Sequence, residues 1–534
     1  MDRRTFMKGA LAGAGAAAVG APRAASASPV NLALPSLGLT PPTARTPVEH
    51  LVVVMMENRS VNHYLGWYGK ENREFDGIQD ASFPDLRQGE DGPLVPTEAW
   101  GQAGRGNFHG RGFADPSHGW TGGRAERHGG TCDGWLHPVT GNDELALSYY
   151  DADDIPVWAR LVRDYQAYDR WFCSLLGPTQ PNRYYLHSAQ SGGLKNNDLP
   201  PERAQENSGW ALGWDWPTVW TLADTYGLTA RYYYSNLPQI AFWGARHLHH
   251  ASPVAEFYAA AATGTLPQLS IIDPWFIAPS GISNDDHPHA DIRLGQAFIS
   301  DIVEAFATSP CYQKAALVVT YDEWGGFWDH VPPPRLPDDR GTPDDPAGED
   351  DFGQLGFRIP SAIMSPWTRT RPGKTSRVDH TVYDHASILR FVSENWGLPY
   401  LTLRHRSTNS IERAFRRFKT FDPEPSYTTY DAPPALLVEP YQDDPLGQLE
   451  QVPGAPDLPD VTPDGGPAPV PNRVAAPAPP PPAPEGSDLH RLAELGWFER
   501  LPVDTDLRFE DSYLHRRPDL LVSAAAEEAT RPRR

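Results

Sequence analysis

Cysteine is scarce in this sequence, with three residues among 534. Cys132, Cys173 and Cys311 are too few and too widely spaced for a disulfide framework or a zinc cage. One disulfide with a leftover thiol and a set of buried free thiols both remain open. Stability is therefore expected to come from a hydrophobic core, which 17 Trp and 40% hydrophobic residues are sufficient to build.

Basic residues are also few relative to acidic ones. The chain has 46 Lys and Arg against 68 Asp and Glu, which gives a net charge of -22. A chain this acidic offers no basic surface to neutralise phosphate repulsion, so a nucleic-acid partner is not expected. An anionic substrate is still compatible with this charge, because a bound metal ion can reverse the local field.

No apolar run is long enough to remain as a membrane span. A short apolar segment at 10–21 lies between two adjacent arginines, Arg3 and Arg4, and a small-residue site at 25–27 (ASA). This arrangement predicts a signal peptide over 1–27, and the paired arginines favour the twin-arginine export machinery. The mature protein is then expected to be periplasmic, associated with the cell envelope or secreted. A disordered basic N-terminus is the alternative.

Short apolar runs bounded by turn residues predict strands that are covered on both faces. These runs are 50–55, 268–272, 315–320 and 359–364. Helical patterns occur at 294–306 and 387–396. Their alternation predicts an α/β fold with a mainly parallel sheet flanked by helices. The stretches 75–134 and 196–258 fit neither period, and they are expected to be loop insertions over the site or surface excursions.

The composition changes near Phe421. Pro, Ala and Gly dominate residues 453–485, which predicts an extended linker without a packed core. The tail at 486–534 contains one short amphipathic helix candidate, 489–498. The main folded domain is placed at 48–425.

Two of the predicted strands end in acidic or amide pairs, Glu57-Asn58 and Asp322-Glu323. In open α/β sheets, ligands bind beyond the carboxyl ends of the strands. Four oxygen donors that converge from two strand ends would suit a hard or borderline divalent cation. Either pair alone could equally be a turn former or a helix cap.

A third element is the segment 177–183 (GPTQPNR), in which Thr179 lies between two prolines. A metal beside its hydroxyl would lower the pKa of that group and create an oxygen nucleophile. Asn182 or Arg183 could then hold a phosphoryl oxygen. The alternative is that Thr179 serves as a helix N-cap.

Histidines supply proton-transfer groups and cationic donors near neutral pH. Four of them lie in acidic, Gly-rich or Pro-rich contexts: His118, His287, His330 and His385. Three others, His247, His249 and His250, form a cluster without such a context and are predicted to lie on the surface.

Together these segments resemble the bacterial phospholipase C and acid phosphatase family, within the alkaline-phosphatase-like superfamily. Five blocks carry the resemblance in order, between about Val48 and Leu403. They are 53–66 (VVMMENRSVNHYLG), 177–183 (GPTQPNR), 286–288 (DHP), 320–334 (TYDEWGGFWDHVPPP) and 384–391 (DHASILRF).

The resemblance implies an alkaline-phosphatase-like α/β fold and phosphate-ester hydrolysis through a covalent intermediate. It makes Thr179 both the nucleophile and a metal ligand. The other implied metal ligands are Glu57, Asn58, Asp322 and Glu323. His118 and His287 are implied to contact the phosphoryl group or assist the leaving group. The implied substrate-binding residues are Asn182, Arg183, His330 and His385.

Threonine at 179, where the acid phosphatase branch has serine, favours the phospholipase C branch. The sequence departs from the family at His289, where a second proline is usual, and at Trp324 to Gly326, which vary the acidic-strand block. It also has a Pro-rich linker and tail where the phospholipases often carry C-terminal β-domains. The prediction is a metal-dependent phosphodiesterase that forms a phosphothreonine. Its substrates are phosphate esters, with phospholipid head groups at a membrane surface as one candidate. The metal is left open among Ca, Mg, Mn and Zn.

Two alternatives to this prediction are kept. An acid phosphatase, which is a phosphomonoesterase, could use the same site. A secreted binding protein that has lost catalysis would belong to a different class, but it predicts weakened ligand pairs, and all five predicted ligands are present.

Overall fold

A computed structural model describes residues 40–198, 213–236, 238–276, 283–340, 351–416, 421–433 and 436. The predicted signal peptide, Pro-rich linker and tail, including the helix candidate at 489–498, lie outside the described residues.

The centre of the fold is an eight-stranded sheet with the order β12-β6-β11-β10-β1-β9-β7-β8. The strands are β1 (His50–Met56), β6 (Gln166–Tyr168), β7 (Ala230–Tyr234), β8 (Ala251–Pro253), β9 (Leu269–Ile272), β10 (Ala315–Tyr321), β11 (Ala362–Met364) and β12 (Val378–Asp379). Neighbours from β10 to β8 are all parallel, and β11 is antiparallel to both β10 and β6. The predicted mainly parallel sheet is therefore confirmed.

The two central strands, β1 and β10, are the most apolar of the predicted runs. Residues 51–56 of β1 and every residue of β10 are buried. Strands covered on both faces need apolar side chains on both sides, so their sequences run without alternation. This is why both strands could be located closely from the sequence.

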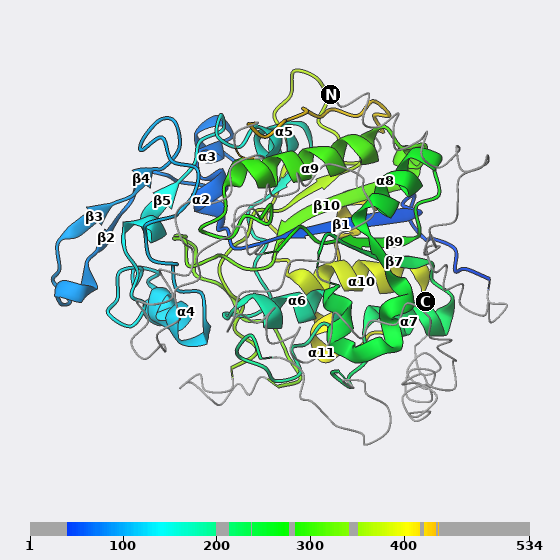
Figure 1. Cartoon of the computed structure of the whole chain (residues 1–534), viewed down its shortest axis with the longest axis horizontal. Coiled ribbons are helices and arrows are strands. Elements are labelled where there is room, and N and C mark those ends of the chain that lie inside the picture. The colour runs from blue at the N-terminus through cyan, green and yellow to red at the C-terminus, as the bar shows by residue number, and fades with distance from the viewer. Residues whose placement is uncertain are drawn as a thin grey trace, which may run out of the picture.

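Helices cover both faces of the sheet (Figure 1). The upper layer contains α5 (Pro156–Asp164), α8 (Val254–Thr263) and α9 (Ile292–Ala307). The lower layer contains α6 (Thr179–Ser188), α7 (Val219–Tyr226), α10 (His385–Trp396) and α11 (Leu403–Ser407). The helices predicted at 294–306 and 387–396 correspond to α9 and α10.

The remaining elements are short. The small strands pair as β2 (Ser82–Pro84) with β3 (Leu94–Pro96), and β4 (Glu98–Ala99) with β5 (Ser148–Tyr149). The short α-helices are α2 (Val61–Leu65), α3 (Tyr68–Glu71), α4 (Trp120–Arg127) and α12 (Arg413–Arg416). The 3-10 helices are η1 (Leu86–Gln88), η2 (His128–Gly130), η3 (Glu144–Leu147), η4 (Gln239–His250) and η5 (Tyr312–Lys314).

The second predicted insertion, 196–258, differs from the expectation of a loop. Its described part contains α7, β7, η4 and β8, and the two strands extend the central sheet. β7 has the sequence ARYYY, and tyrosine favours strands because its ring packs well on a pleated, half-buried surface. Mixed apolar and polar character hides this strand from a search for wholly apolar runs.

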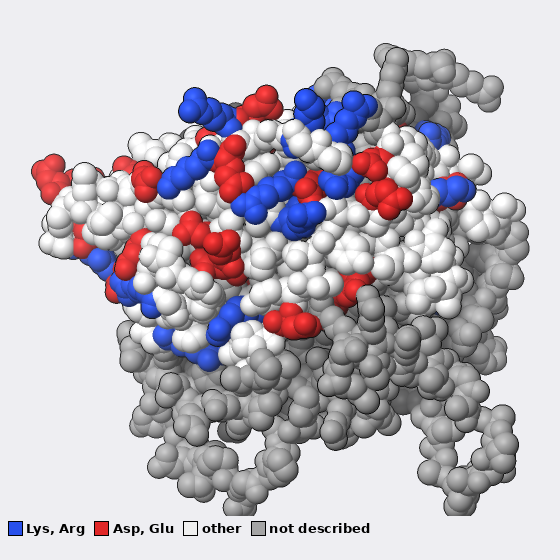
Figure 2. All heavy atoms as spheres, turned by 90° about the horizontal axis from the view of Figure 1, so that it is seen from above, with Lys and Arg blue, Asp and Glu red and all other residues white. Residues whose placement is uncertain are grey.

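The three cysteines are free and buried, which matches one of the two alternatives left open by the sequence. Within the described ranges, no helix combines the length and the apolar character that a membrane span requires. On the face that carries α5 and α9, basic and acidic side chains are interspersed (Figure 2). The acidic excess of the chain is not gathered into one area on that face.

Candidate active site at the carboxyl ends of β1 and β10

Glu57 and Asn58 directly follow β1, and Asp322 and Glu323 directly follow β10. The two strands are parallel neighbours whose last residues are paired, so both acidic pairs leave the sheet at the same level. The backbone amides of Asn58 and Glu323 donate to Oδ1 of Asp322 over 3.1 and 2.7 Å. The structure therefore brings together the two pairs that were predicted from separate parts of the sequence.

The loop after β10 folds back tightly onto the loop after β1. Asn58 has a φ of 61°, a left-handed conformation that Asn adopts more readily than most residues. Gly325 lies against it, and a Cβ on Gly325 would be 2.2 Å from the carbonyl oxygen of Asn58. The backbone amide of Gly325 also donates to Oε2 of Glu323 over 2.6 Å. A glycine at this position is thus required for the approach of the two acidic pairs.

Thr179 is the first residue of α6 and is 8% exposed. Its hydroxyl donates to Oε2 of Glu57 over 3.4 Å. The N-cap of α6 is Pro178, and the helix has no side-chain cap, so the alternative role of Thr179 as an N-cap is wrong. The hydroxyl is instead directed at the first acidic pair.

Asn182 lies one turn into α6 and fixes the loop that precedes Thr179. Its Nδ2 donates to the carbonyl oxygens of Leu175 and Gly177 over 3.1 and 2.8 Å, and its Oδ1 accepts from the amide of Leu175 over 2.9 Å. The side chain therefore positions the nucleophile loop through backbone contacts. Its predicted contact with substrate stays a prediction.

Arg183 is buried, and its guanidinium joins three carboxylates. Nε lies 2.7 Å from Oε1 of Glu57 and 3.4 Å from Oδ2 of Asp322. Nη1 donates to Oδ1 of Asp273 over 3.0 Å. Burial would lower the pKa of the guanidinium, but the carboxylates of Glu57, Asp273 and Asp322 raise it. Arg183 is thus a fixed cation within the acidic site, and its predicted contact with substrate stays a prediction.

His287 approaches the site with one nitrogen anchored. Its Nδ1 lies 2.8 Å from Oδ2 of Asp285, and its Nε2 lies 3.5 Å from Oε2 of Glu57. Burial would lower the pKa of His287, but the Asp285 carboxylate raises it above its ordinary value. The Asp285 carboxylate therefore stabilises the imidazolium form, in which Nε2 faces the site with a proton.

In His118, unlike His287, the nitrogen that faces the site carries a lone pair in the neutral ring. Its Nδ1 donates to the carbonyl oxygen of Pro116 over 2.7 Å, so in the neutral ring Nε2 carries the lone pair. Nε2 lies 3.4 Å from Nδ2 of Asn58 and 3.9 Å from Oε1 of Glu323. The side chain is 17% exposed and that of His287 is 21% exposed, so solvent reaches both.

His385 and His330 occupy different surroundings. His385 is buried at the start of α10, where its Nε2 donates to the carbonyl oxygen of Asp322 over 2.7 Å, and burial lowers its pKa. His330 contacts Asp76 through Nε2 over 2.9 Å and Asn62 through Nδ1 over 2.8 Å. His385 therefore holds the end of β10, whereas His330 belongs to a neighbouring network. Substrate contacts by either histidine stay predictions.

The oxygen donors at the acidic pairs fit a divalent cation. Within the described part of the chain, three buried oxygens there have no hydrogen-bond partner: Asn58 Oδ1, Asp322 Oδ2 and Glu323 Oε1. Burial raises the pKa of Glu57 and Glu323 well above the ordinary value, because charged carboxylates are costly in an apolar surrounding. Converging carboxylate and amide oxygens are the ligands that hard divalent cations select. The residues present therefore fit the metal that the family resemblance implies.

Several residues of the site were not assigned from the sequence. Asp285 orients His287, and Asp273 holds Arg183 from the end of β9. The position of Asp273 directly after a predicted strand was an available signal, since that strand ends at the same edge of the sheet.

The prediction that the cluster of His247, His249 and His250 lies on the surface is wrong. His247 and His250 are 3% and 2% exposed. Asp224, His249 and His250 form a group that could hold a metal ion, away from the acidic pairs.

The fold and the site define a class of protein, an α/β enzyme with a buried hydroxyl beside converging oxygen donors at the carboxyl edge of its sheet. Residues 48–399 match the model of the Phosphoesterase family, and the chain belongs to that family. It is a phosphoric ester hydrolase. The resemblance found in the five sequence blocks is thereby confirmed.

Named relatives occur in plants and bacteria. The chain is 30% identical over 412 residues to non-specific phospholipase C1 of Arabidopsis thaliana, covering 69% of this chain and 71% of that protein. It is 28% identical over 405 residues to phospholipase C B of Mycobacterium tuberculosis, covering 66% and 74%. The solved structure of a protein in the alkaline phosphatase superfamily from Vibrio parahaemolyticus matches with a TM-score of 0.30 and 10% identity over 74% of both chains.

Proposed function

We propose that this protein is a metal-dependent phosphodiesterase of the phospholipase C type, with Thr179 as its nucleophile. The observation that carries the proposal is the contact of the Thr179 hydroxyl with Glu57, beside three buried oxygens that have no hydrogen-bond partner within the described residues. A hydroxyl at the edge of a cation-binding oxygen cluster is a suitable nucleophile for phosphoryl transfer.

The substrate class is proposed from the relatives. Proteins named phospholipase C come from Arabidopsis thaliana and Mycobacterium tuberculosis, and each alignment covers about two thirds of this chain. The threonine at 179 is consistent with the phospholipase C branch of the resemblance. Phospholipid head-group diesters at a membrane surface are therefore the proposed substrates.

In the first step, the Thr179 oxygen attacks phosphorus and its proton passes to Glu57, whose Oε2 accepts the hydroxyl hydrogen bond. The bond from phosphorus to the leaving alcohol breaks, and the imidazolium of His287 supplies the proton to that alcohol. The products of this step are a free alcohol and Thr179 esterified to the phosphoryl group, which still carries the head group of the diester.

In the second step, water attacks the phosphothreonine and the Thr179 oxygen leaves. The Nε2 lone pair of His118 accepts a proton from that water, because its Nδ1 is committed to Pro116. The threonine oxygen regains a proton from Glu57. Attack from opposite sides in the two steps inverts the configuration at phosphorus twice, so the net result is retention.

The cation would be held by Glu57, Asn58, Thr179, Asp322 and Glu323. When bound, it would lower the pKa of the threonine hydroxyl and neutralise charge on the phosphoryl oxygens. Calcium, magnesium, manganese and zinc are all compatible with oxygen ligands. Elemental analysis of protein purified without chelators, followed by chelation and readdition of each ion, tests this part of the proposal.

The substrate assignment is tested with a panel of esters that share one chromogenic leaving group. We expect hydrolysis of p-nitrophenyl phosphorylcholine to exceed that of p-nitrophenyl phosphate. The reverse order at all pH values would favour the phosphomonoesterase alternative, which uses the same residues. Mass spectrometry of enzyme that is acid-quenched during turnover of p-nitrophenyl phosphorylcholine should find a phosphorylcholine group on Thr179, and its appearance on any other residue would contradict the nucleophile assignment.

Export is proposed separately, on the paired arginines Arg3 and Arg4 and the segment that follows them. Expression of the full chain in a bacterium with a twin-arginine translocase should place the protein outside the cytoplasm. Replacement of both arginines by lysine should retain it in the cytoplasm. Equal export of the variant, or export in a strain that lacks the translocase, would contradict this route.

A further inference from the structure

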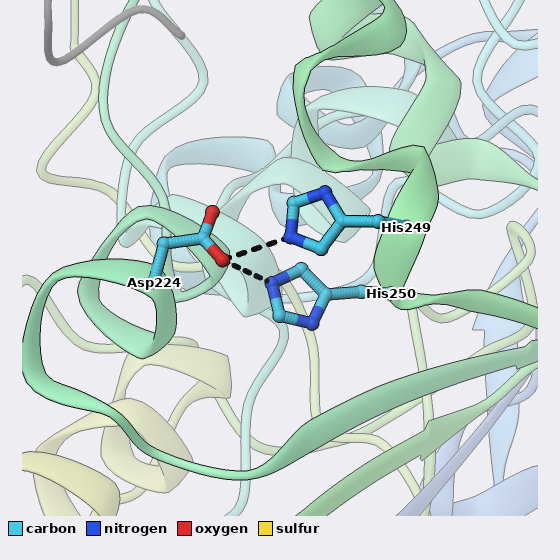
Figure 3. A group of neighbouring side chains, drawn as sticks. All are labelled: Asp224, His249 and His250. Atoms are coloured by element: carbon cyan, nitrogen blue, oxygen red, sulfur yellow. Dashed lines mark hydrogen bonds and ion pairs between the residues drawn. The ribbon is translucent and has the colours of Figure 1, made fainter. Parts of the chain in front are cut away.

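A second group of metal-ligating side chains lies between α7 and η4 (Figure 3). Asp224 belongs to α7, and His249 and His250 end η4. Nε2 of His249 and Nε2 of His250 lie 2.8 and 2.9 Å from the same oxygen, Oδ1 of Asp224. The three ligand atoms all lie within 4.8 Å of one another. None of these residues takes part in the proposed phosphoryl transfer.

The hydrogen bonding of His250 constrains where its lone pair lies. Its Nδ1 lies 3.1 Å from the carbonyl oxygen of Ala230, which can only accept a hydrogen bond, so Nδ1 carries a proton. In the neutral ring, Nε2 is then unprotonated and its lone pair points at the Asp224 carboxylate. That contact is repulsive unless a second proton or a cation lies between the two groups. A backbone carbonyl on the outer nitrogen is the usual way in which a metal-binding histidine is oriented.

The imidazole of His247 also faces the carboxylate of Asp224. Its Nε2 lies 3.4 and 3.3 Å from the hydroxyls of Thr218 and Thr221, which can accept its proton. Its Nδ1 lies 3.5 Å from Oδ2 of Asp224 and has no hydrogen-bond partner within the described part of the chain. The ring is 3% exposed, so this nitrogen is a buried polar atom aimed into the cluster. Buried polar atoms without partners are uncommon and call for a ligand.

Two imidazoles and one carboxylate, with a third imidazole beside them, are a donor set that suits a borderline divalent ion. Nitrogen ligands suit zinc and its transition-metal neighbours, whereas calcium and magnesium prefer oxygen. Three of these side chains, Asp224, His249 and His250, have ligand atoms within 4.8 Å of one another, and they come from two different elements, which an ion bound there would join.

We propose that Asp224, His249 and His250, with the imidazole of His247 beside them, bind a zinc-class ion that fastens η4 to α7. The ion joins a helix to a segment of short 3-10 turns with a kink at Gly244, where backbone hydrogen bonding is weak. The ring of Trp220 packs on His250 at 5.3 Å and its Nε1 donates to His187 of α6 over 3.1 Å. The site therefore also stabilises the packing of α7 against the helix that begins at Thr179.

The proposal is tested on the full chain, stripped with a chelator and dialysed against zinc. Zinc content is measured by elemental analysis in wild type and in the variants Asp224→Asn and His249→Gln. The matched control is His380→Gln, which removes an exposed histidine that contacts a single carboxylate, that of buried Asp169. We expect each cluster variant to lose about one zinc ion per chain and the control to lose none. Equal zinc content in all four proteins overturns the proposal.

A second measurement does not depend on the folding of a variant. Zinc K-edge absorption of the wild-type protein should contain the multiple scattering of several imidazole rings. The ligands proposed at the active site are all oxygen donors, so imidazole scattering reports this second site alone. A spectrum with oxygen ligands only overturns the proposal while leaving the phosphodiesterase assignment intact. Conversely, imidazole scattering in an inactive protein would support this site and count against the other proposal.

Discussion

Two clusters of ionisable residues lie near opposite ends of the parallel strands of the same sheet. The first follows the carboxyl ends of β1 and β10 and consists of oxygen donors around the guanidinium of Arg183. The second lies near the start of β7, where His250 contacts Ala230, and consists of three imidazoles around Asp224. The first contains a hydroxyl that contacts a carboxylate directly, and in the second the threonine hydroxyls contact an imidazole instead. The comparison indicates chemistry at one end of the strands and structural support at the other.

The largest expected effect separates the two clusters by activity. Thr179→Ala should lower kcat for a phosphodiester by about 10³-fold or more, because it removes the nucleophile. Thr179→Ser should retain part of the activity, since it keeps a hydroxyl at the start of α6. Steady-state kinetics measure the effect, with the exposed Thr265→Ala as the matched control. Turnover of Thr179→Ala within tenfold of wild type would remove the functional distinction between the clusters.

The same variant also tests whether the two clusters are independent of each other. Thr179→Ala leaves every residue of the Asp224 cluster unchanged, so the imidazole signal in zinc absorption should persist. Loss of that signal together with activity would mean that the two clusters are not independent.

The next effect is on stability and concerns Arg183, the cation that balances the buried carboxylates of the acidic site. Arg183→Gln leaves Glu57, Asp273 and Asp322 buried without their shared cation, which should cost about 3–5 kcal/mol in the free energy of unfolding. Urea denaturation measures this. The control is Arg163→Gln, which removes an exposed ion pair with Glu71 and should cost less than about 1 kcal/mol. Similar losses in the two variants would contradict the central role of Arg183.

Much of the first cluster could be predicted because its signals are local. Apolar runs located β1 and β10, and the residues directly after them supplied the acidic pairs. The parallel register then placed the pairs together, since neighbouring parallel strands end at one edge. Asp273 directly follows β9 and could have been predicted in the same way.

The second cluster could not be predicted because its partners are remote in sequence. A role of His249 and His250 in metal binding depends on Asp224, which lies on α7 and is separated from η4 in the sequence by β7. Three nearby histidines without an adjacent acid resemble a surface segment when only the chain order is known. Likewise, Asn182 and Arg183 lie in a motif that suggests substrate contacts, but only the fold reveals their bonds to Leu175 and Glu57.

A pH effect is expected just behind the first cluster. Asp286 is buried, and burial raises its pKa to about 7, although the Tyr321 hydroxyl donates to its Oδ2 over 2.6 Å. The folded state therefore holds a proton that the unfolded state releases near pH 4. Stability from this group is complete below about pH 4 and is lost as the pH rises through about 7.

Asp286→Asn should remove that dependence. The asparagine stays neutral and tolerates the φ of 75° at this position. Relative to wild type, the variant should gain roughly 2–4 kcal/mol in the free energy of unfolding between pH 4 and pH 8. Asp85→Asn is a control that should stay nearly independent of pH over this range, because the hydrogen bond from Arg87 lowers the pKa of Asp85 to about 2 and its contribution changes only below about pH 4. A difference between Asp286→Asn and wild type that does not change with pH would contradict the raised pKa.

The smallest expected effect is that of a substitution of His330, compared with the same substitution of His287. His330 contacts Asp76 and Asn62, whereas His287 lies 3.5 Å from Glu57 and presents a proton toward the site. His287→Gln should lower kcat by about 10²–10⁴-fold, because it removes a general acid. His330→Gln should lower kcat by less than about tenfold, because Gln can keep a hydrogen bond to Asp76 and no proposed proton transfer passes through this ring. Equal losses in the two variants would place His330 in direct contact with the substrate, as the sequence predicted, and would extend the active site across the network of Asp76.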